Sequence, residues 1–144
     1  MHEVGPDGKG RLKIFLSFAT GVGKTFRLLD EAHRRAKRGQ DVVIGFIDPR
    51  KRASTEEHMQ GFEVITPQTI SYGGRDYETL NVDEIIKRHP ELVLVDDLEK
   101  KNPPGAGHEY RWQDVEQILE HGIAVLTSMN VAHLESLNDK IADI

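Results

Sequence analysis

Glycine, lysine and threonine stand together at Gly21-Val22-Gly23-Lys24-Thr25, in an order that suits phosphate binding. Glycines let main-chain N–H groups curl around an anion, a lysine at this place reaches the terminal phosphates of a nucleotide, and a threonine hydroxyl can coordinate Mg²⁺. The complete Walker A pattern, G-x-x-x-x-G-K-[ST], has glycine at its first position, where this chain has Phe18. We predict a phosphate loop that departs from that pattern at one position and contacts a nucleotide through Gly21, Val22, Gly23, Lys24, Thr25 and Phe26.

A pair of acidic residues, Asp96 and Asp97, follows the apolar run at 92–95. An acid at the carboxyl end of a strand beside the phosphate-loop strand can hold Mg²⁺ through water. Because side chains alternate along a strand, the two carboxylates are expected to point to opposite sides, so that only one faces the metal. We assign Asp96 to Mg²⁺. Asp97 is then either a base that orients water or a cap of the following turn.

These residues need a sheet to bring them together, and the chain has the pattern for one. Apolar runs typical of buried strands alternate with segments of helical periodicity. Such alternation favours a parallel sheet with right-handed crossovers. We therefore predict an α/β, P-loop NTPase-like domain of three layers with a mainly parallel sheet and a small β-hairpin insertion. The predicted strands are 12–16, 41–47, 92–95 and 123–126, and the predicted helices are 24–37, 82–88 and 112–120.

Two stretches depart from this alternation. Residues 62–77 are predicted to hold a short apolar strand and then Gly73-Gly74, whose glycines can adopt the positive φ values of a tight turn. We predict that this stretch is a β-hairpin attached to the sheet. Residues 98–111 are polar and rich in glycine and proline. They follow a strand end, where loops often carry function, and we expect this loop to report whether the nucleotide is bound.

Length and composition limit the classes of protein to consider. With 144 residues, 38% hydrophobic and 30% charged, the chain suits one soluble domain, and no window is apolar enough for direct membrane insertion. The absence of cysteine excludes disulfides and thiolate metal sites and fits a cytoplasmic location. A net charge of -5 argues against broad nucleic-acid binding. Residues 1–10 lack the apolar core of a secretion signal, so we predict a flexible leader there and one domain at 11–144.

Several long segments resemble the cytoplasmic N-terminal domain of KdpD-type sensor histidine kinases, bacterial proteins that respond to potassium limitation and turgor. They include "EAHRRAKRGQDVVIGF", "LVLVDDLEKKNPPGAGHEYRWQDVEQIL" and "HGIAVLTSMNVAHLESLND". The resemblance implies a P-loop domain that binds ATP and adjusts the kinase and phosphatase activities of a membrane-anchored receptor in a two-component system. Its partners would be the rest of a sensor kinase and a response-regulator pathway. We expect a segment of a longer protein, with a stand-alone module as the alternative.

The chain departs from the family pattern at several places. Ser17 and Phe18 replace smaller residues near the phosphate, and Asp97 stands where the family usually has glutamate. The family's Glu-Thr-His-Gly-Arg run corresponds to residues 48–52, here Asp-Pro-Arg-Lys-Arg, and its Ala-His-Thr run to residues 99–101, here Glu-Lys-Lys. The predicted phosphate and metal residues are intact. We therefore expect a regulatory nucleotide binder with little or no hydrolysis.

Arg111 and Asn130 are weaker candidates for contact with the nucleotide. Arg111 opens a predicted helix and can reach a phosphate, but an exposed cation that fixes the loop is the simpler interpretation. Asn130 suits a helix N-cap, and in the family its segment resembles a turn that faces the nucleotide. The run from Arg34 to Arg38 is interpreted as a solvated helix end, where cations offset the helix dipole. The seven histidines show no spacing typical of a transition-metal site.

Two other functions stay open on the sequence alone. One is a small P-loop phosphotransferase similar to thymidine kinases or corrinoid adenosyltransferases, although no pocket for a second substrate can be identified. The other is a degenerate P-loop kept as an interaction surface, in which Phe18 fills the phosphate cradle and Lys24 is an ordinary solvated residue. Turnover of nucleosides would favour the first, and failure to bind ATP would favour the second.

Overall fold

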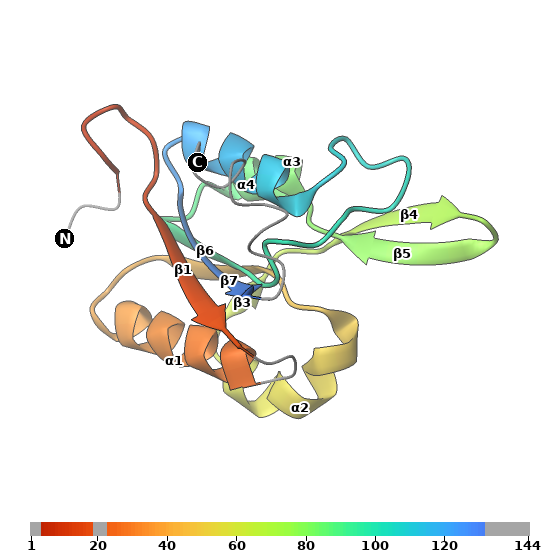
Figure 1. Ribbon diagram of the computed structural model, residues 1–144. Helices are drawn as coiled ribbons and strands as arrows, with labels where there is room; N and C mark the ends of the chain where they lie inside the picture. Colours follow the sequence, from red (N-terminus) through yellow and green to blue (C-terminus); the bar gives the residue numbers. More distant parts are fainter. Residues whose placement is uncertain (1–3, 19–22, 132–144) are drawn as a thin grey trace.

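The computed structural model describes residues 4–18 and 23–131, and a five-stranded parallel sheet forms its centre (Figure 1). Neighbouring strands follow the order β1, β7, β6, β2, β3. β2 and β6 are buried along their whole length, which accounts for their unbroken apolar sequences. The four predicted strands are confirmed, and β3 is the short strand predicted at the start of residues 62–77. The bounds are β1 Leu12–Ser17, β2 Val42–Phe46, β3 Glu63–Val64, β6 Leu92–Val95 and β7 Ala124–Asn130.

Helices on both faces of the sheet give the domain three layers (Figure 1). On one face, α1 (Gly23–Lys37) buries Leu28 and Leu29 against the sheet. On the other face, α3 (Val82–Arg88) and α4 (Arg111–Glu120) bury apolar side chains, among them Ile85 and Ile118. The three predicted helices are confirmed to within one residue at each end. An α/β fold with a mainly parallel sheet is therefore established.

α2 (Pro49–Met59) is a helix that the sequence pattern did not reveal. Thr55 is its one buried residue, so it lacks the apolar periodicity by which amphipathic helices are recognised. Local signals start it. Asp48 accepts a hydrogen bond from the N–H of Arg50 at 2.9 Å, and Pro49 occupies the first turn, where a missing N–H costs nothing. The helix lies beside α1, to which His58 Nε2 connects it through Asp30 Oδ1 at 2.6 Å.

The predicted hairpin is confirmed, but its attachment to the main sheet is wrong. β4 (Gln68–Tyr72) and β5 (Arg75–Thr79) pair with each other as a separate antiparallel sheet that projects from the domain (Figure 1). Gly73 and Gly74 have φ values of 61° and 77°, which a tight hairpin turn requires. Most side chains of this hairpin are exposed and polar, so it has little apolar surface to bury against the sheet.

The position of β6 also differs from the expectation. We expected the strand that ends in Asp96 to lie beside the phosphate-loop strand, but β7 lies between β1 and β6. All three strands run parallel, so their carboxyl ends still meet at one edge of the sheet. A residue after β6 can therefore reach the beginning of α1 across one intervening strand.

The run from Arg34 to Arg38 is not simply a solvated helix end. Arg35 is buried, and its Nε donates to Glu31 Oε2 at 2.9 Å. Arg34 donates to the other oxygen of Glu31, and Lys13 Nζ lies 3.5 Å from Oε2. Burial raises the pKa of Glu31, but the hydrogen bonds from Arg35 and Arg34 outweigh it and lower that pKa to about 2. This cluster joins α1 to β1.

Residues 4–10 form a turn closed by a bridge between Val4 and Gly10. The N–H of Gly10 donates to the carbonyl of Leu119 at 2.7 Å, and a Cβ at Gly10 would lie 1.9 Å from the carbonyl oxygen of Ile123. The predicted boundary between a leader and the domain at residue 10 stays a prediction. None of the helices in the described ranges is both long enough and apolar enough to span a bilayer.

Candidate functional site

The beginning of α1 and the end of β6 meet at the carboxyl edge of the sheet. Thr25 Oγ1 donates a hydrogen bond to Asp96 Oδ2 at 2.8 Å, and Lys24 Nζ lies 2.6 Å from Asp97 Oδ1. All four residues are buried, with exposed fractions of 6% or less. The structure thus brings together the lysine, the hydroxyl and both acids that the sequence analysis singled out.

Lys51, in the first turn of α2, is a member of this cluster that the sequence analysis did not select. Its Nζ lies 3.2 Å from Asp96 Oδ2 and 2.9 Å from Asp97 Oδ2, and its side chain is 15% exposed. Two ammonium groups and two carboxylates therefore form one buried ion-pair network. Its position in the chain could have revealed Lys51, because residues that follow β2 lie at the same edge of a parallel sheet as those that follow β6.

The two carboxylates converge, although strand alternation predicted that they point to opposite sides. Alternation ends with β6 at Val95. Asp97 then adopts the left-handed conformation, with φ of 57°, which is uncommon for a residue other than glycine. This turn of the backbone brings the Asp97 side chain to the same side as Asp96, so both reach Lys51. The prediction of opposite orientations was wrong because it extended strand geometry beyond the strand.

The ammonium groups set the charge of Asp97. Burial raises the pKa of this carboxyl, but hydrogen bonds from Lys24 and Lys51 outweigh burial and leave the pKa below its usual value. Burial likewise lowers the pKa of Lys51, and the charges of Asp96 and Asp97 more than offset this and raise it. Asp97 and Lys51 are therefore both charged at neutral pH.

Ser128, near the end of β7, completes the surroundings of the acids. Its Oγ donates to Asp96 Oδ1, and the N–H of Asp97 donates to Ser128 Oγ at 3.1 Å. The N–H of Asp97 also lies 3.1 Å from Asp96 Oδ1. The Asp96 carboxylate thus accepts from a main-chain N–H and two hydroxyls as well as from Lys51, whereas the Asp97 carboxylate pairs with Lys24 and Lys51. Ser128 was missed because nothing in its own sequence context marks it.

Arg111 is buried, so its interpretation as an exposed cation was wrong. Its Nη1 donates to the carbonyl of Asp96 at 2.7 Å, and its guanidinium lies 4.6 Å from the centre of the Phe46 ring. Burial lowers its pKa despite the nearby Asp97 and Asp96 charges. Arg111 does fix the loop 98–111, because its main-chain N–H also donates to the carbonyl of Lys100. Contact of Arg111 with a nucleotide stays a prediction.

The remaining predicted contacts are only partly described. Gly21 and Val22 lie outside the described residues. Gly23 begins α1, and the Phe26 ring, half-buried, lies 5.5 Å from the ring of His58. The Phe18 side chain is 92% exposed, so it does not pack over the buried network.

Asn130 is the last residue of β7 and is buried. Its main-chain N–H donates to Glu99 Oε1 at 3.2 Å, which connects the end of β7 to the loop after β6. The helix expected to follow Asn130 lies outside the described residues. Its role as a helix cap or nucleotide contact therefore stays a prediction.

The donor set fits Mg²⁺ bound together with phosphate rather than a metal held by protein alone. Within residues 4–18 and 23–131, no group of three or more histidines and acids could hold a metal ion. The Thr25 hydroxyl and the Asp96 carboxylate are oxygen ligands of the kind that Mg²⁺ prefers. Protein sites for Mg²⁺ commonly supply one or two such groups and leave the other positions to water and substrate phosphates.

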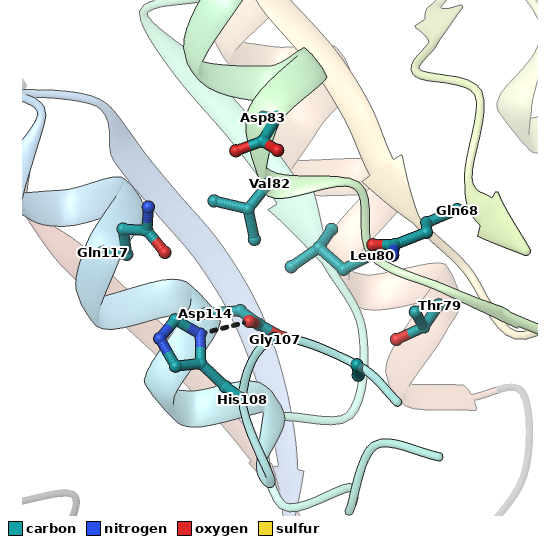
Figure 2. Close-up of a pocket in the computed structure, with 10 residues that line it drawn as sticks. Gln68, Thr79, Leu80, Val82, Asp83, Gly107, His108, Asp114 and Gln117 are labelled. Atoms are coloured by element: carbon teal, nitrogen blue, oxygen red, sulfur yellow. Dashed lines mark hydrogen bonds and ion pairs between the residues drawn. The ribbon is translucent and has the colours of Figure 1, made fainter. Parts of the chain in front are cut away.

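A separate cavity of about 290 Å³ lies between the hairpin, the loop 98–111, α3 and α4 (Figure 2). His108 Nδ1 lies 2.7 Å from Asp114 Oδ1 on its wall, and Asn102 Nδ2 donates to Asp114 Oδ2 at 2.8 Å. The cavity shares no lining residue with the ion-pair network. These polar contacts hold the loop 98–111 against α4 and so help to position Arg111 at the start of that helix.

Comparison with known proteins identifies the family of this chain. Residues 8–144 match the family described as KdpD, osmosensitive K⁺ channel His kinase sensor domain. This chain belongs to the KdpD sensor-domain family. It is 44% identical over 136 residues to the sensor protein KdpD of Mycobacterium tuberculosis, which covers 94% of the chain and 16% of the relative. For the sensor protein KdpD of Escherichia coli K12, identity is 40% over 144 residues, all of the chain and 16% of the relative.

The KdpD relatives are larger than this chain. A putative sensor protein KdpD of Synechocystis is 42% identical over 139 residues, which covers 96% of the chain and 38% of that protein. The chain thus spans about one sixth of the Mycobacterium tuberculosis and Escherichia coli proteins. Membership of the KdpD family confirms the resemblance found in the sequence.

Proposed function

We propose that this chain is a regulatory domain that binds Mg²⁺–ATP and adjusts the kinase and phosphatase output of a KdpD-type sensor kinase in response to potassium limitation. In this proposal the main chain around Gly21 to Gly23 and the Lys24 ammonium bind the phosphates. Thr25 and, through water, Asp96 bind Mg²⁺. The bound metal neutralises phosphate charge, and the domain responds to occupancy with little or no hydrolysis.

The single observation that carries the proposal is the hydrogen bond from Thr25 to Asp96 beside the buried Lys24. A hydroxyl at the start of a helix and an acid at the end of a parallel strand, meeting at one edge of the sheet, resemble the Mg²⁺ arrangement of P-loop proteins. An ordinary solvated lysine in a tight turn would not be buried, whereas Lys24 is 6% exposed. A buried lysine that can exchange its carboxylate partner for a phosphate is suited to sense an anion.

Binding can be tested by following thermal unfolding and by isothermal titration calorimetry with Mg²⁺–ATP. At a hundredfold excess over the dissociation constant, a ligand that binds only the folded state stabilises it by about 2.7 kcal/mol. For a domain of this size that corresponds to a rise in melting temperature of about 5–10 °C. Lys24→Met should abolish most of the calorimetric signal, because it removes the cation that faces the phosphates.

Lys37→Met is the matched control, because Lys37 is an exposed lysine at the opposite end of α1. It should bind Mg²⁺–ATP as the wild type does. Absence of binding by the wild type would reject the nucleotide proposal, and equal binding by the wild type and Lys24→Met would remove Lys24 from the site. Turnover of added nucleosides would instead favour a phosphotransferase.

A further inference from the structure

Two donors share one oxygen of Asp96. Thr25 Oγ1 lies 2.8 Å and Lys51 Nζ 3.2 Å from Asp96 Oδ2. Thr25 and Asp96 are the two groups assigned to Mg²⁺, so the Lys51 ammonium lies at the oxygen that the metal shell would use. A positive group of this chain therefore stands beside the proposed position of a divalent cation.

The network already holds as many ammonium groups as carboxylates, because Lys24 and Lys51 face Asp96 and Asp97. The Thr25 and Ser128 hydroxyls also donate to the Asp96 carboxylate, and the Arg111 guanidinium donates to the Asp96 carbonyl. Adding a divalent cation would place a third positive centre within a few ångströms of Lys51 in a buried site. Like charges repel where little water screens them, so we expect that the Lys51 ammonium and the water shell of a bound metal do not share the Asp96 carboxylate.

We propose that Lys51 is a built-in cation that competes with the divalent metal for Asp96, and that Mg²⁺–nucleotide must displace it. This inference rests on the proposed function. The consequence is selectivity for metal that arrives with a nucleotide. A free divalent metal gains too little binding free energy to displace the ammonium, whereas phosphates bound with the metal add contacts with Lys24 and the phosphate loop. Lys51 thereby couples occupancy of the site to the position of α2.

α2 is suited to respond because few buried contacts hold it. Thr55 is its single buried residue, and polar contacts hold both of its ends: the Lys51 ion pairs in the first turn, and the contacts of His58 with Asp30 and His33 of α1 in the last turn. The next residue, Arg52, donates to the carbonyl of Ile47 at 3.0 Å and lies 3.2 Å from Glu78 on the hairpin. Release of Lys51 would loosen the first turn of α2 and the adjoining contact with β5.

Mn²⁺ alone, followed by the electron paramagnetic resonance signal of the free ion, tests the competition without nucleotide. Lys51→Met removes the ammonium and keeps an unbranched side chain. We expect it to bind Mn²⁺ at least about tenfold more tightly than the wild type, because one positive charge is lost beside two buried carboxylates. Lys51→Gln provides a second neutral variant if the methionine variant folds poorly by circular dichroism, and it should show the same direction.

Arg50→Met is the matched control. Arg50 is one residue away on α2, its side chain is 78% exposed, and it pairs with Asp48. It removes the same charge without touching the network, so its Mn²⁺ affinity should equal that of the wild type. If neither folded Lys51 variant binds Mn²⁺ more tightly than the wild type and Arg50→Met, the competition is refuted.

Amide hydrogen exchange supplies a readout of α2. Exchange of residues 49–59 should accelerate in Lys51→Gln without ligand and in the wild type on addition of Mg²⁺ with a non-hydrolysable ATP analogue. Unchanged exchange in both cases would contradict the coupling. The two proposals can be refuted separately. If the wild type binds Mg²⁺–ATP but the Lys51 variants gain no affinity for Mn²⁺, the proposed function stands and the competition by Lys51 is refuted.

Discussion

The Thr25 hydroxyl donates to the Asp96 carboxylate at 2.8 Å, although the two residues are 71 positions apart in the chain. One begins the helix after β1, and the other follows β6, with β7 between them. Parallel strand direction is what makes this contact possible, because it brings the carboxyl ends of all three strands to one edge. The contact joins the proposed phosphate loop to the proposed metal acid.

Thr25→Val should weaken Mg²⁺–ATP binding by about tenfold, equivalent to about 1.4 kcal/mol, because valine keeps the shape of threonine and removes the hydroxyl. Thr25→Ser restores a hydroxyl and should recover most of the affinity. Calorimetric titrations with and without Mg²⁺ measure the effect. A Thr25→Val loss that is equally large without Mg²⁺ would show that the hydroxyl does not act through the metal.

Arg111→Lys should destabilise the fold by about 2–4 kcal/mol, because a lysine cannot both lie flat over the Phe46 ring and donate to the Asp96 carbonyl. Urea unfolding gives the free energy difference. Arg52→Lys is the control on the same ring: the Arg52 guanidinium lies 5.9 Å from the Phe46 centre and its side chain is 34% exposed. Its cost should stay below about 1 kcal/mol. Equal costs at the two positions would show that burial of Arg111 contributes nothing.

Glu31→Gln should lower the free energy of unfolding by about 1–3 kcal/mol at pH 7, because it replaces the carboxylate that pairs with the buried Arg35 by a neutral amide. The folded-state pKa of Glu31 is lowered from 4.5 to about 2. The contribution of Glu31 is therefore complete above pH 4.5 and is lost as the pH falls towards 2. Urea unfolding across this range should show wild type and variant converging.

The exposed Glu56 of α2 provides the control for that series at neutral pH. Glu56→Gln should change the free energy of unfolding by less than about 0.5 kcal/mol at pH 7. A gap between wild type and Glu31→Gln that stays constant from neutral pH into the acid range would argue against an ionised Glu31 as the source of the stabilisation.

Gly45→Ala should destabilise the sheet by about 1–3 kcal/mol through overpacking. A Cβ there would lie 2.7 Å from Cγ2 of Val93, a stiff β-branched side chain in the neighbouring strand, at a point where the register of β2 and β6 shifts. Gly107→Ala, with nothing within 4 Å of its Cβ, should stay within about 0.5 kcal/mol. Thermal unfolding of the two variants compares them, and equal melting temperatures would contradict the steric argument.

Much of the fold could be predicted because most of its helices and strands have a recognisable pattern of apolar residues in the sequence. Leu92 to Val95 is apolar at every position because β6 is covered on both faces, and α1 repeats its apolar residues at helical spacing. α2 escaped because a helix with a single buried residue has no periodicity to detect. The strand order could not be predicted, because the hydrophobic pattern shows which strands are buried but not which of them are neighbours.

For the candidate site, the sequence by itself determined the residue types: Lys24, Thr25, Asp96 and Asp97 stand after apolar strands in a pattern that already indicates phosphate and Mg²⁺. Only the tertiary structure decided their partners. It turned Asp97 through a left-handed φ of 57° to face the same lysine as Asp96, and it brought Lys51 to both acids from a helix without apolar periodicity. The physical reason is that strand and helix periodicities are local, whereas the meeting of charges depends on turns and on parallel strands that end at one edge.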